Sequence, residues 1–303
     1  MAIITPALIT SLRTGYSKAF QDALAATPTD WAKIATRVPS SNTSNTYGWL
    51  GQFPKLREWV GDRVLKDMAA SGYQITNKLF EGTVAVKRTD IEDDNIGIYT
   101  PLFAEMGRAA AAHPDELVFG LLAAGESTLC YDGQNFFDTD HPVYENVDGT
   151  GTTTLVSNYD NGGASPGPAW YLLDCSRALK PLIFQERTTP ELESLTSTQD
   201  EGVFMRDEYR FGVRYRCNAG FGFWQMAYKS KAALDATNFN AAMAAMMQVK
   251  ADGGRPLGIK PTHLLVGPLL RADALKLVES QLTGGGDSNP NYKAVEVIVS
   301  PWL

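Results

Sequence analysis

An alternating run of aromatic and basic residues constrains the fold of this chain more than any other feature. The run extends from Met205 to Cys217, and its two sets of side chains are Tyr209, Phe211, Val213, Tyr215 and Cys217 against Arg210, Arg214 and Arg216. Successive side chains of a strand point to opposite faces, so the run predicts a strand with one buried aromatic face and one face of guanidinium groups. Such a row is usually solvated or ion-paired, but it could also meet acidic groups of a neighbouring subunit.

The longest helical pattern follows Thr100-Pro101, a pair typical of a helix start. Apolar residues then recur at helical spacing as far as Ala124, which predicts a spine helix over about 100–124. Pro114 lacks a backbone N–H and crowds the carbonyl of Ala110, so we expect a kink or break near His113.

The segment before the spine predicts an extended organisation. Residues 1 to about 38 resemble an arm with a helix over 7–25, and a flexible polar connector follows over 40–46. Residues 47–95 form a second unit with three short strand candidates, at 64–68, 73–77 and 83–87, and a hairpin turn at Ser71-Gly72. A two-stranded ribbon is marginally stable alone, so we expect the arm and the ribbon to find their burial on a partner subunit.

After the spine the sequence is rich in turns over 127–168 and then contains strand-like runs at 171–173 and 182–185. From about residue 236 the order is helix, strand, helix and strand, which predicts a compact α/β subdomain over 236–303. The overall fold class is therefore α+β.

Composition excludes several classes of function. The 303 residues include 27 basic and 34 acidic side chains, a net charge of −7, which disfavours tight binding of nucleic acid by the whole surface. No apolar run is long enough for a transmembrane helix, and no secretory signal is evident. The cysteines are three and widely spaced, which predicts reduced, structural thiols: Cys130, Cys175 and Cys217.

Two groups of residues could carry chemistry or binding. Asp138, Asp140 and His141 could bind a divalent cation or act as a general base in a cytoplasmic metal-dependent enzyme. The favoured interpretation is a turn in which the aspartates cap backbone amides. Trp49, Phe53 and Trp59 could stack on bases or on a ligand, but aromatic anchors of a subunit contact fit better. We expect no catalytic residue, no cofactor and no metal.

Five long stretches resemble the family of major head subunits of phage Mu and Mu-like prophages, gpT. They span nearly the whole chain in order: SNTYGWLGQFPKLREWVGDR (44–63), FEGTVAVKRTDIEDDNIGIY (80–99), CYDGQNFFDTDHPVY (130–144), VFMRDEYRFGVRYRCNAGFGFWQMA (203–227) and DGGRPLGIKPTHLLV (252–266).

The resemblance implies a Hong-Kong-97-type capsid fold. Its parts would be an N-terminal arm over 1–46, an E-loop over 47–90, a P-domain over 91–235 with the spine helix, and an A-domain over 236–303. In many relatives the A-domain precedes the last P-domain strands, whereas the α/β segment comes last here. Candidate intersubunit contacts are Tyr47, Trp49, Phe53, Trp59, Arg63, Arg210, Arg214 and Arg216.

The resemblance also implies a function without enzymatic activity. The chain would self-assemble into hexamers and pentamers of an icosahedral head that encloses double-stranded DNA without reading its sequence. It would be a virion protein assembled in the host bacterial cytoplasm. Its partners would be a separate scaffolding protein, a maturation protease, a portal at one vertex and a decoration protein, with no membrane. A phage tail or decoration component is the alternative structural role.

Overall fold

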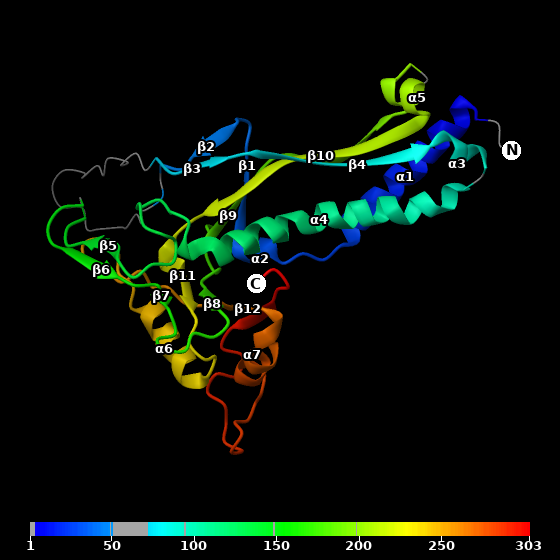
Figure 1. Ribbon diagram of the computed structural model, residues 1–303. Helices are drawn as coiled ribbons and strands as arrows, with labels where there is room; N and C mark the ends of the chain where they lie inside the picture. Colours follow the sequence, from blue (N-terminus) through cyan, green and yellow to red (C-terminus); the bar gives the residue numbers. More distant parts are fainter. Residues whose placement is uncertain (1–3, 49, 51–71, 94, 148, 198) are drawn as a thin grey trace.

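The alternating run forms the middle of a four-stranded sheet, the long sheet (Figure 1). The computed structural model describes residues 4–48, 50, 72–93, 95–147, 149–197 and 199–303. In spatial order the long sheet consists of β1 (Ala35–Pro39), β9 (Leu182–Leu195), β10 (Glu208–Phe221) and β4 (Lys78–Lys87). β10 is antiparallel to both of its neighbours, and β1 is parallel to β9. The strand starts later than predicted because helix α5 (Glu201–Arg206) precedes it.

The aromatic face of β10 is buried as predicted. Tyr209, Phe211 and Tyr215 are all at most 5% exposed, and Phe211 makes an edge-to-face contact with Phe103 of helix α4 (Tyr99–Ala123) at 5.0 Å. α4 is the predicted spine, and of the kink or break expected near His113 the break is wrong, because the helix runs unbroken through Pro114. Pro114 is itself buried, so packing offsets the backbone hydrogen bond that proline removes.

Helix α1 (Pro6–Ala26) lies along α4. Thr5 caps it, because its hydroxyl accepts the backbone N–H of Leu8 at 3.2 Å. Tyr16 and Phe20 are buried between the two helices, and the Tyr16 ring stacks on Phe103 at 4.4 Å. The expectation that the arm finds its burial on another subunit is therefore wrong for Tyr16 and Phe20 of α1, which are buried in their own chain.

Part of the polar connector forms a strand, which the sequence analysis did not predict. After the short helix α2 (Trp31–Ile34) and β1, strand β2 (Ser44–Thr46) pairs antiparallel with β3 (Gln74–Thr76). The amide of Asn77 donates to Ser40 Oγ and to the carbonyl of Asn42, both at 2.9 Å. The strand candidate at 64–68 and the Ser71 side of its turn lie outside the described residues.

Strand β4 is longer than the predicted 83–87 and pairs along its whole length with β10. This part of the ribbon is therefore stabilised within its own chain. The reason is visible in the pattern itself, because alternation predicts a half-buried strand but does not identify the strand beside it.

A second, five-stranded sheet, the lobe sheet, forms the core of a compact lobe below α4 (Figure 1). In spatial order it contains β13 (Glu296–Val299), β12 (His263–Val266), β8 (Trp170–Leu173), β11 (Ala227–Ser230) and β7 (Tyr159–Asp160). Helices α6 (Ala236–Met247) and α7 (Arg271–Val278) complete the predicted helix–strand order. Three of the five strands precede residue 236, so the lobe crosses the predicted boundary between 235 and 236.

The remaining elements are short. They are α3 (Arg88–Glu92), the hairpin of β5 (His141–Tyr144) and β6 (Thr153–Val156), and the 3₁₀ helices η1 (Asn95–Ile98), η2 (Ala124–Glu126), η3 (Trp224–Met226) and η4 (Pro268–Leu270). Among the described residues, none of the helices has the length and apolar character needed to cross a bilayer.

Candidate functional site: the outer face of the long sheet and a buried cluster

The arginines of β10 lie on the face of the long sheet opposite the buried aromatic residues. The strand register places Glu81 of β4 and Glu191 of β9 on either side of Arg214. Within the described part of the chain, Arg214 nevertheless has no carboxylate within ion-pair distance, and it is exposed. The outer face is therefore a mixed charged surface in which Arg214 is available to another molecule.

The three arginines differ in how far their own chain uses them. Both Nε and Nη2 of Arg210 donate to Glu208, at 3.0 and 2.7 Å, and its guanidinium lies against Gly202 of α5. Arg216 is half-buried, and among the described residues it also has no carboxylate partner. Arg210 is thus engaged within the chain, whereas Arg214 and Arg216 are not.

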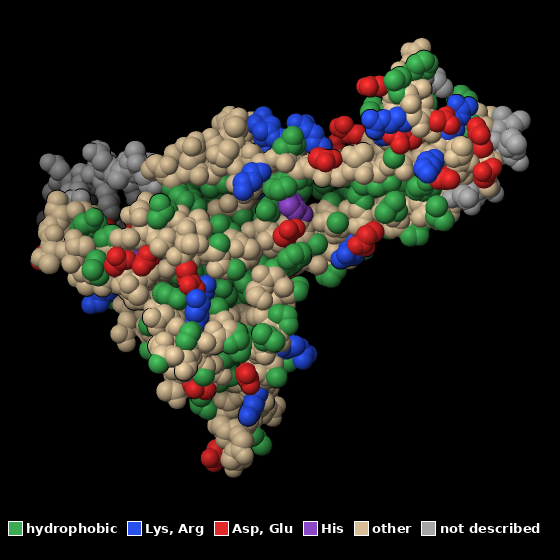
Figure 2. Space-filling view, viewed as in Figure 1, with side chains coloured by type: hydrophobic (Ala, Val, Ile, Leu, Met, Phe, Trp, Pro, Cys, Tyr) green, Lys and Arg blue, Asp and Glu red, His purple; other side chains and the backbone are tan. Residues whose placement is uncertain are grey.

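Large apolar side chains are exposed at the end of the long sheet where α5 projects (Figure 2). Phe204 is 82% and Met205 68% exposed, and Leu195 at the end of β9 lies opposite Arg210 in the register. Their neighbour Val203 is buried and anchors α5 to the core. An ordered helix that carries two exposed large apolar side chains is typical of an interaction surface.

Of the intersubunit contacts predicted between residues 47 and 63, the structure describes only Tyr47. Tyr47 is buried in its own chain, and its hydroxyl donates to Gln185 Oε1 at 2.8 Å. It therefore has almost no surface left for a neighbouring subunit. The other predicted contacts of this segment lie outside the described residues: Trp49, Phe53, Trp59 and Arg63.

The residues of the possible metal-dependent site do not converge. Asp138 acts as a turn cap, as the favoured interpretation predicts, and accepts the amide groups of Asn135 and the backbone N–H of Thr139. A hydrogen bond with Asp138 raises the pKa of Asp140. His141 instead contacts Asp132, with 2.8 Å between its Nδ1 and Asp132 Oδ2.

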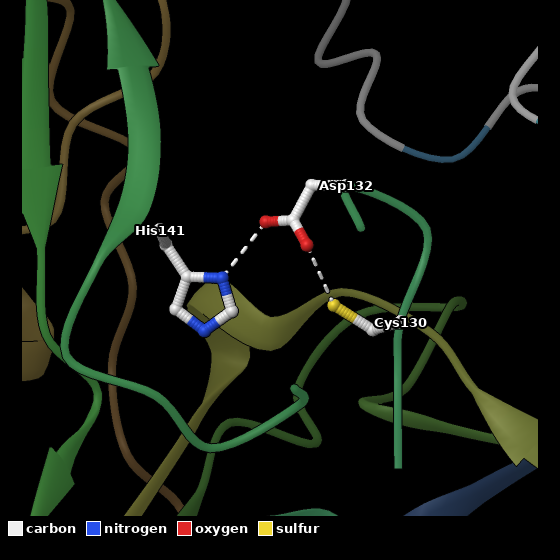
Figure 3. A group of neighbouring side chains, drawn as sticks. All are labelled: Cys130, Asp132 and His141. Atoms are coloured by element: carbon white, nitrogen blue, oxygen red, sulfur yellow. Dashed lines mark hydrogen bonds and ion pairs between the residues drawn. The ribbon is translucent and has the colours of Figure 1, made fainter. Parts of the chain in front are cut away.

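A different cluster forms around His141 (Figure 3). The carboxylate of Asp132 lies between two groups: one oxygen contacts His141, and the other accepts the Cys130 thiol at 2.9 Å. The ligand atoms of the three residues lie within 4.8 Å of one another. Cys130 and Asp132 come from the loop after η2, and His141 begins β5. Sequence reasoning missed this cluster, although a Cys-x-Asp pair whose aspartate lies nine residues before a histidine was a usable signal.

Burial governs the chemistry of this cluster. It raises the pKa of the Cys130 thiol well above its usual range, and the nearby Asp132 charge adds to that effect. For Asp132, burial raises the pKa, but the hydrogen bonds from His141 and Cys130 outweigh it and leave the pKa below the ordinary value. The His141 ring is fully buried and stacks on Trp224 at 4.0 Å. This thiol is therefore protonated and not a nucleophile.

A buried ion pair joins the spine to the lobe sheet. Lys229 of β11 lies 2.5 Å from Glu126 and also donates to the Ala123 carbonyl at the end of α4. Lys231 contacts the other oxygen of Glu126 at 2.8 Å. Burial lowers the pKa of Lys229 despite its carboxylate partner. The two halves of the molecule are thus connected by a charged contact as well as by the apolar core.

The solved structures that this chain resembles are capsid proteins, so the elongated helix-and-sheet half joined to a compact lobe is the α+β Hong-Kong-97-type capsid fold. The chain of the procapsid of bacteriophage JBD30 matches it with a TM-score of 0.88 at 63% identity, and the match covers 99% of this chain and 100% of that one. A chain of the JBD30 capsid decorated with minor capsid protein trimers matches with a TM-score of 0.75 at 47% identity, covering all of both chains.

The chain belongs to the family of the Mu-like prophage major head subunit gpT, whose model matches residues 9–303. It is also 50% identical over 304 residues to the major capsid protein of Escherichia phage Mu, covering 99% of this chain and 100% of that protein. It is therefore a major capsid protein of a Mu-like phage, a structural component of the virion and not an enzyme.

Proposed function

We propose that copies of this chain form hexamers and pentamers that close into an icosahedral head around double-stranded DNA. Membership of a family of major head subunits and the similarity to JBD30 capsid chains support this proposal. Closed shells require the same surface patches to be used repeatedly with small adjustments. Assembly takes place in the host bacterial cytoplasm, and the net charge of −7 suits a wall that does not hold DNA tightly.

In this assignment the long sheet with α4 is the P-domain, and the lobe sheet with α6 and α7 is the A-domain. The A-domain then takes residues 159–173 as well as 227–303, in place of the predicted 236–303. The E-loop ends before β4, and thus before residue 90, because β4 is a strand of the long sheet. The arm keeps residues 1–46, with α1 folded onto its own spine.

The outer face of the long sheet is the contact that we assign to a neighbouring copy. The observation that carries this assignment is Arg214, exposed and without a carboxylate partner among the described residues although Glu81 and Glu191 flank it in the register. Arg216 and the exposed Phe204 extend the same contact. Charged groups at such a contact determine which surfaces meet, and buried aromatic groups supply much of the affinity.

A charge reversal tests the contact. Arg214→Glu should leave the free energy of unfolding within about 0.5 kcal/mol of the original, because the side chain is exposed. It should reduce the yield of closed shells, measured by sedimentation and electron microscopy. Lys276→Glu makes the same charge change on the exposed side of α7 and is the control. Normal shell yield with Arg214→Glu would remove Arg214 from the contact.

The proposed partners are a separate scaffolding protein, a maturation protease, a portal and a decoration protein. The similarity to a chain of the JBD30 capsid decorated with minor capsid protein trimers supports the last of these. Expression of this chain alone should give irregular or open assemblies. Uniform closed shells from the chain alone would contradict the need for a scaffolding protein.

A further inference from the structure

The loop that follows the spine helix contains three different kinds of metal-binding atom in one place. Cys130 offers sulfur, Asp132 oxygen and His141 nitrogen, and these atoms lie within 4.8 Å of one another. No other such group occurs in the described ranges of the chain. Thiolate, imidazole and carboxylate together are the donors that zinc uses in proteins.

The cluster is enclosed but not sealed. His141 is fully buried and Cys130 is 5% exposed, whereas the Asp132 side chain is 11% exposed and connects the cluster to solvent. The hairpin-like turn that carries Cys130 is closed by its own backbone, since Cys130 N–H donates to the Gln134 carbonyl at 2.8 Å. The donors are therefore held in place by the fold before any ion arrives.

The state of His141 suits a ligand. Its Nε2 is buried and has no hydrogen-bond partner among the described residues. Nδ1 forms a hydrogen bond with Asp132 Oδ2 at 2.8 Å, so an ion that binds Nδ1 takes the place of this hydrogen bond. Stacking on Trp224 fixes the plane of the ring, so that Nδ1 stays directed at Asp132.

The charges of the three donors also favour a divalent ion. In the metal-free state the thiol proton of Cys130 is donated to Asp132. A divalent ion that displaces this proton to solvent would meet one thiolate and one carboxylate, so the occupied site would bury no net charge. The neutral imidazole would be the third ligand, and water would complete the coordination.

We propose that Cys130, Asp132 and His141 bind one zinc-type divalent ion, which fastens the loop after η2 to the start of β5. The site is structural, and it is independent of the intersubunit contacts proposed above. It differs from the site considered at Asp138, Asp140 and His141 because it shares only the histidine with that group. Ion binding would stabilise the folded chain, since the unfolded chain does not hold the three donors together.

Cobalt substitution tests the proposal on the purified full-length protein. After treatment with a chelator, the protein is titrated with Co²⁺ alone and then with Zn²⁺. We expect one ion per chain, an absorption band from sulfur-to-cobalt charge transfer, loss of that band on adding Zn²⁺, and a higher melting temperature with Zn²⁺. Less than one ion per chain at saturation, or binding without the sulfur band, would overturn the proposal.

Variants locate the ion. Cys130→Ser and His141→Gln should both abolish stoichiometric binding, whereas Cys175→Ser, a control cysteine outside the cluster, should retain it. Asp140→Asn should also retain it. Stoichiometric binding that survives Cys130→Ser, or that is lost in Asp140→Asn, would place the ion elsewhere and refute the assignment. The titration of the unchanged protein remains decisive if a variant fails to fold.

Discussion

The long sheet and the lobe sheet bury their strands in different ways. In the lobe, all four residues of β8 are buried, from Trp170 to Leu173, and the neighbouring β12 has only one residue that is not. In the long sheet, β10 alternates between buried and partly exposed positions along most of its length. The lobe strands β8 and β12 are therefore covered on both faces, whereas most of β10 is covered by the described residues on one face only.

This difference indicates which of the two strands, β8 or β10, has a face left for other copies. A strand buried on both faces has all its apolar side chains satisfied inside the chain. A strand with one free face can present charged groups without any cost to its own core. In this protein the free face carries Arg214, and the neighbouring tip carries the exposed Phe204.

The largest expected effect is the loss of a side chain from the lobe. Leu172→Ala should lower the free energy of unfolding by about 3 kcal/mol, because Leu172 is fully buried in the middle strand of the lobe sheet. Leu79→Ala on β4 should change it by no more than about 0.5 kcal/mol, since Leu79 is 59% exposed. Denaturant unfolding of both variants checks this, and equal losses would contradict the contrast between the sheets.

A smaller effect is expected where the two halves meet. Glu126→Gln should cost about 2 kcal/mol, because it leaves the buried Lys229 without its charged partner. The double variant Glu126→Gln with Lys229→Met should recover much of this loss, since an apolar side chain needs no partner. The measurement is again denaturant unfolding, and no recovery in the double variant would show that the ion pair is not the source of the loss.

A third change concerns the contact between the spine and the arm. The carboxylate of Asp115 accepts the backbone N–H groups of Asp30 at 3.1 Å and of Trp31 at 2.6 Å, at the start of α2. Asp115→Ala should therefore cost about 1 kcal/mol. Hydrogen exchange should speed up at these two amides while the amides of β10 remain protected. Unchanged exchange at Trp31 would argue against this anchoring role.

The smallest expected effect depends on pH. Burial lowers the pKa of His263 at the start of β12, against the attraction of Glu296 and in the same direction as the nearby Lys33 and Lys180. Asp174 also acts on this ring and raises its pKa. The unfolded chain therefore binds a proton more readily than the folded chain below pH about 6.5, so stability should fall as pH decreases below that value.

His263→Asn should weaken this dependence. The comparison is the midpoint of urea unfolding at pH 7.5 and at pH 5.5 for both proteins. A fall in the midpoint that is equally steep in the variant would assign the pH dependence to other groups.

Much of the fold is predictable from sequence where the pattern is local. The aromatic face of β10, the spine α4, and the elements α6, β12, α7 and β13 all follow from periodicity. The predictions that failed concern which elements pack against one another. Nothing local in residues 83–87 identifies β10 as the neighbour, and nothing in residues 7–25 shows that α1 packs on its own spine. The break predicted from Pro114 does not occur, because the packing of this long helix outweighs the free-energy cost of a proline inside it.

For the candidate sites, too, the local pattern was predictable from the sequence and the contacts were not. Alternation alone placed Arg210, Arg214 and Arg216 on one face, but only the structure shows that Arg210 is already occupied by Glu208. The side chain of His141 points to Asp132 and not to its sequence neighbours, because the loop after η2 folds back on β5. Proximity along the chain was therefore a poor guide to proximity in space.

Gly107 determines how closely the arm approaches the spine. A methyl group at this position would collide with the carbonyl oxygen of Phe20, so α1 and α4 cross with backbone against backbone. A larger residue at this position would force the two helices apart and widen the elongated half across its axis. In a shell made of many copies, that change in spacing would be repeated in every subunit.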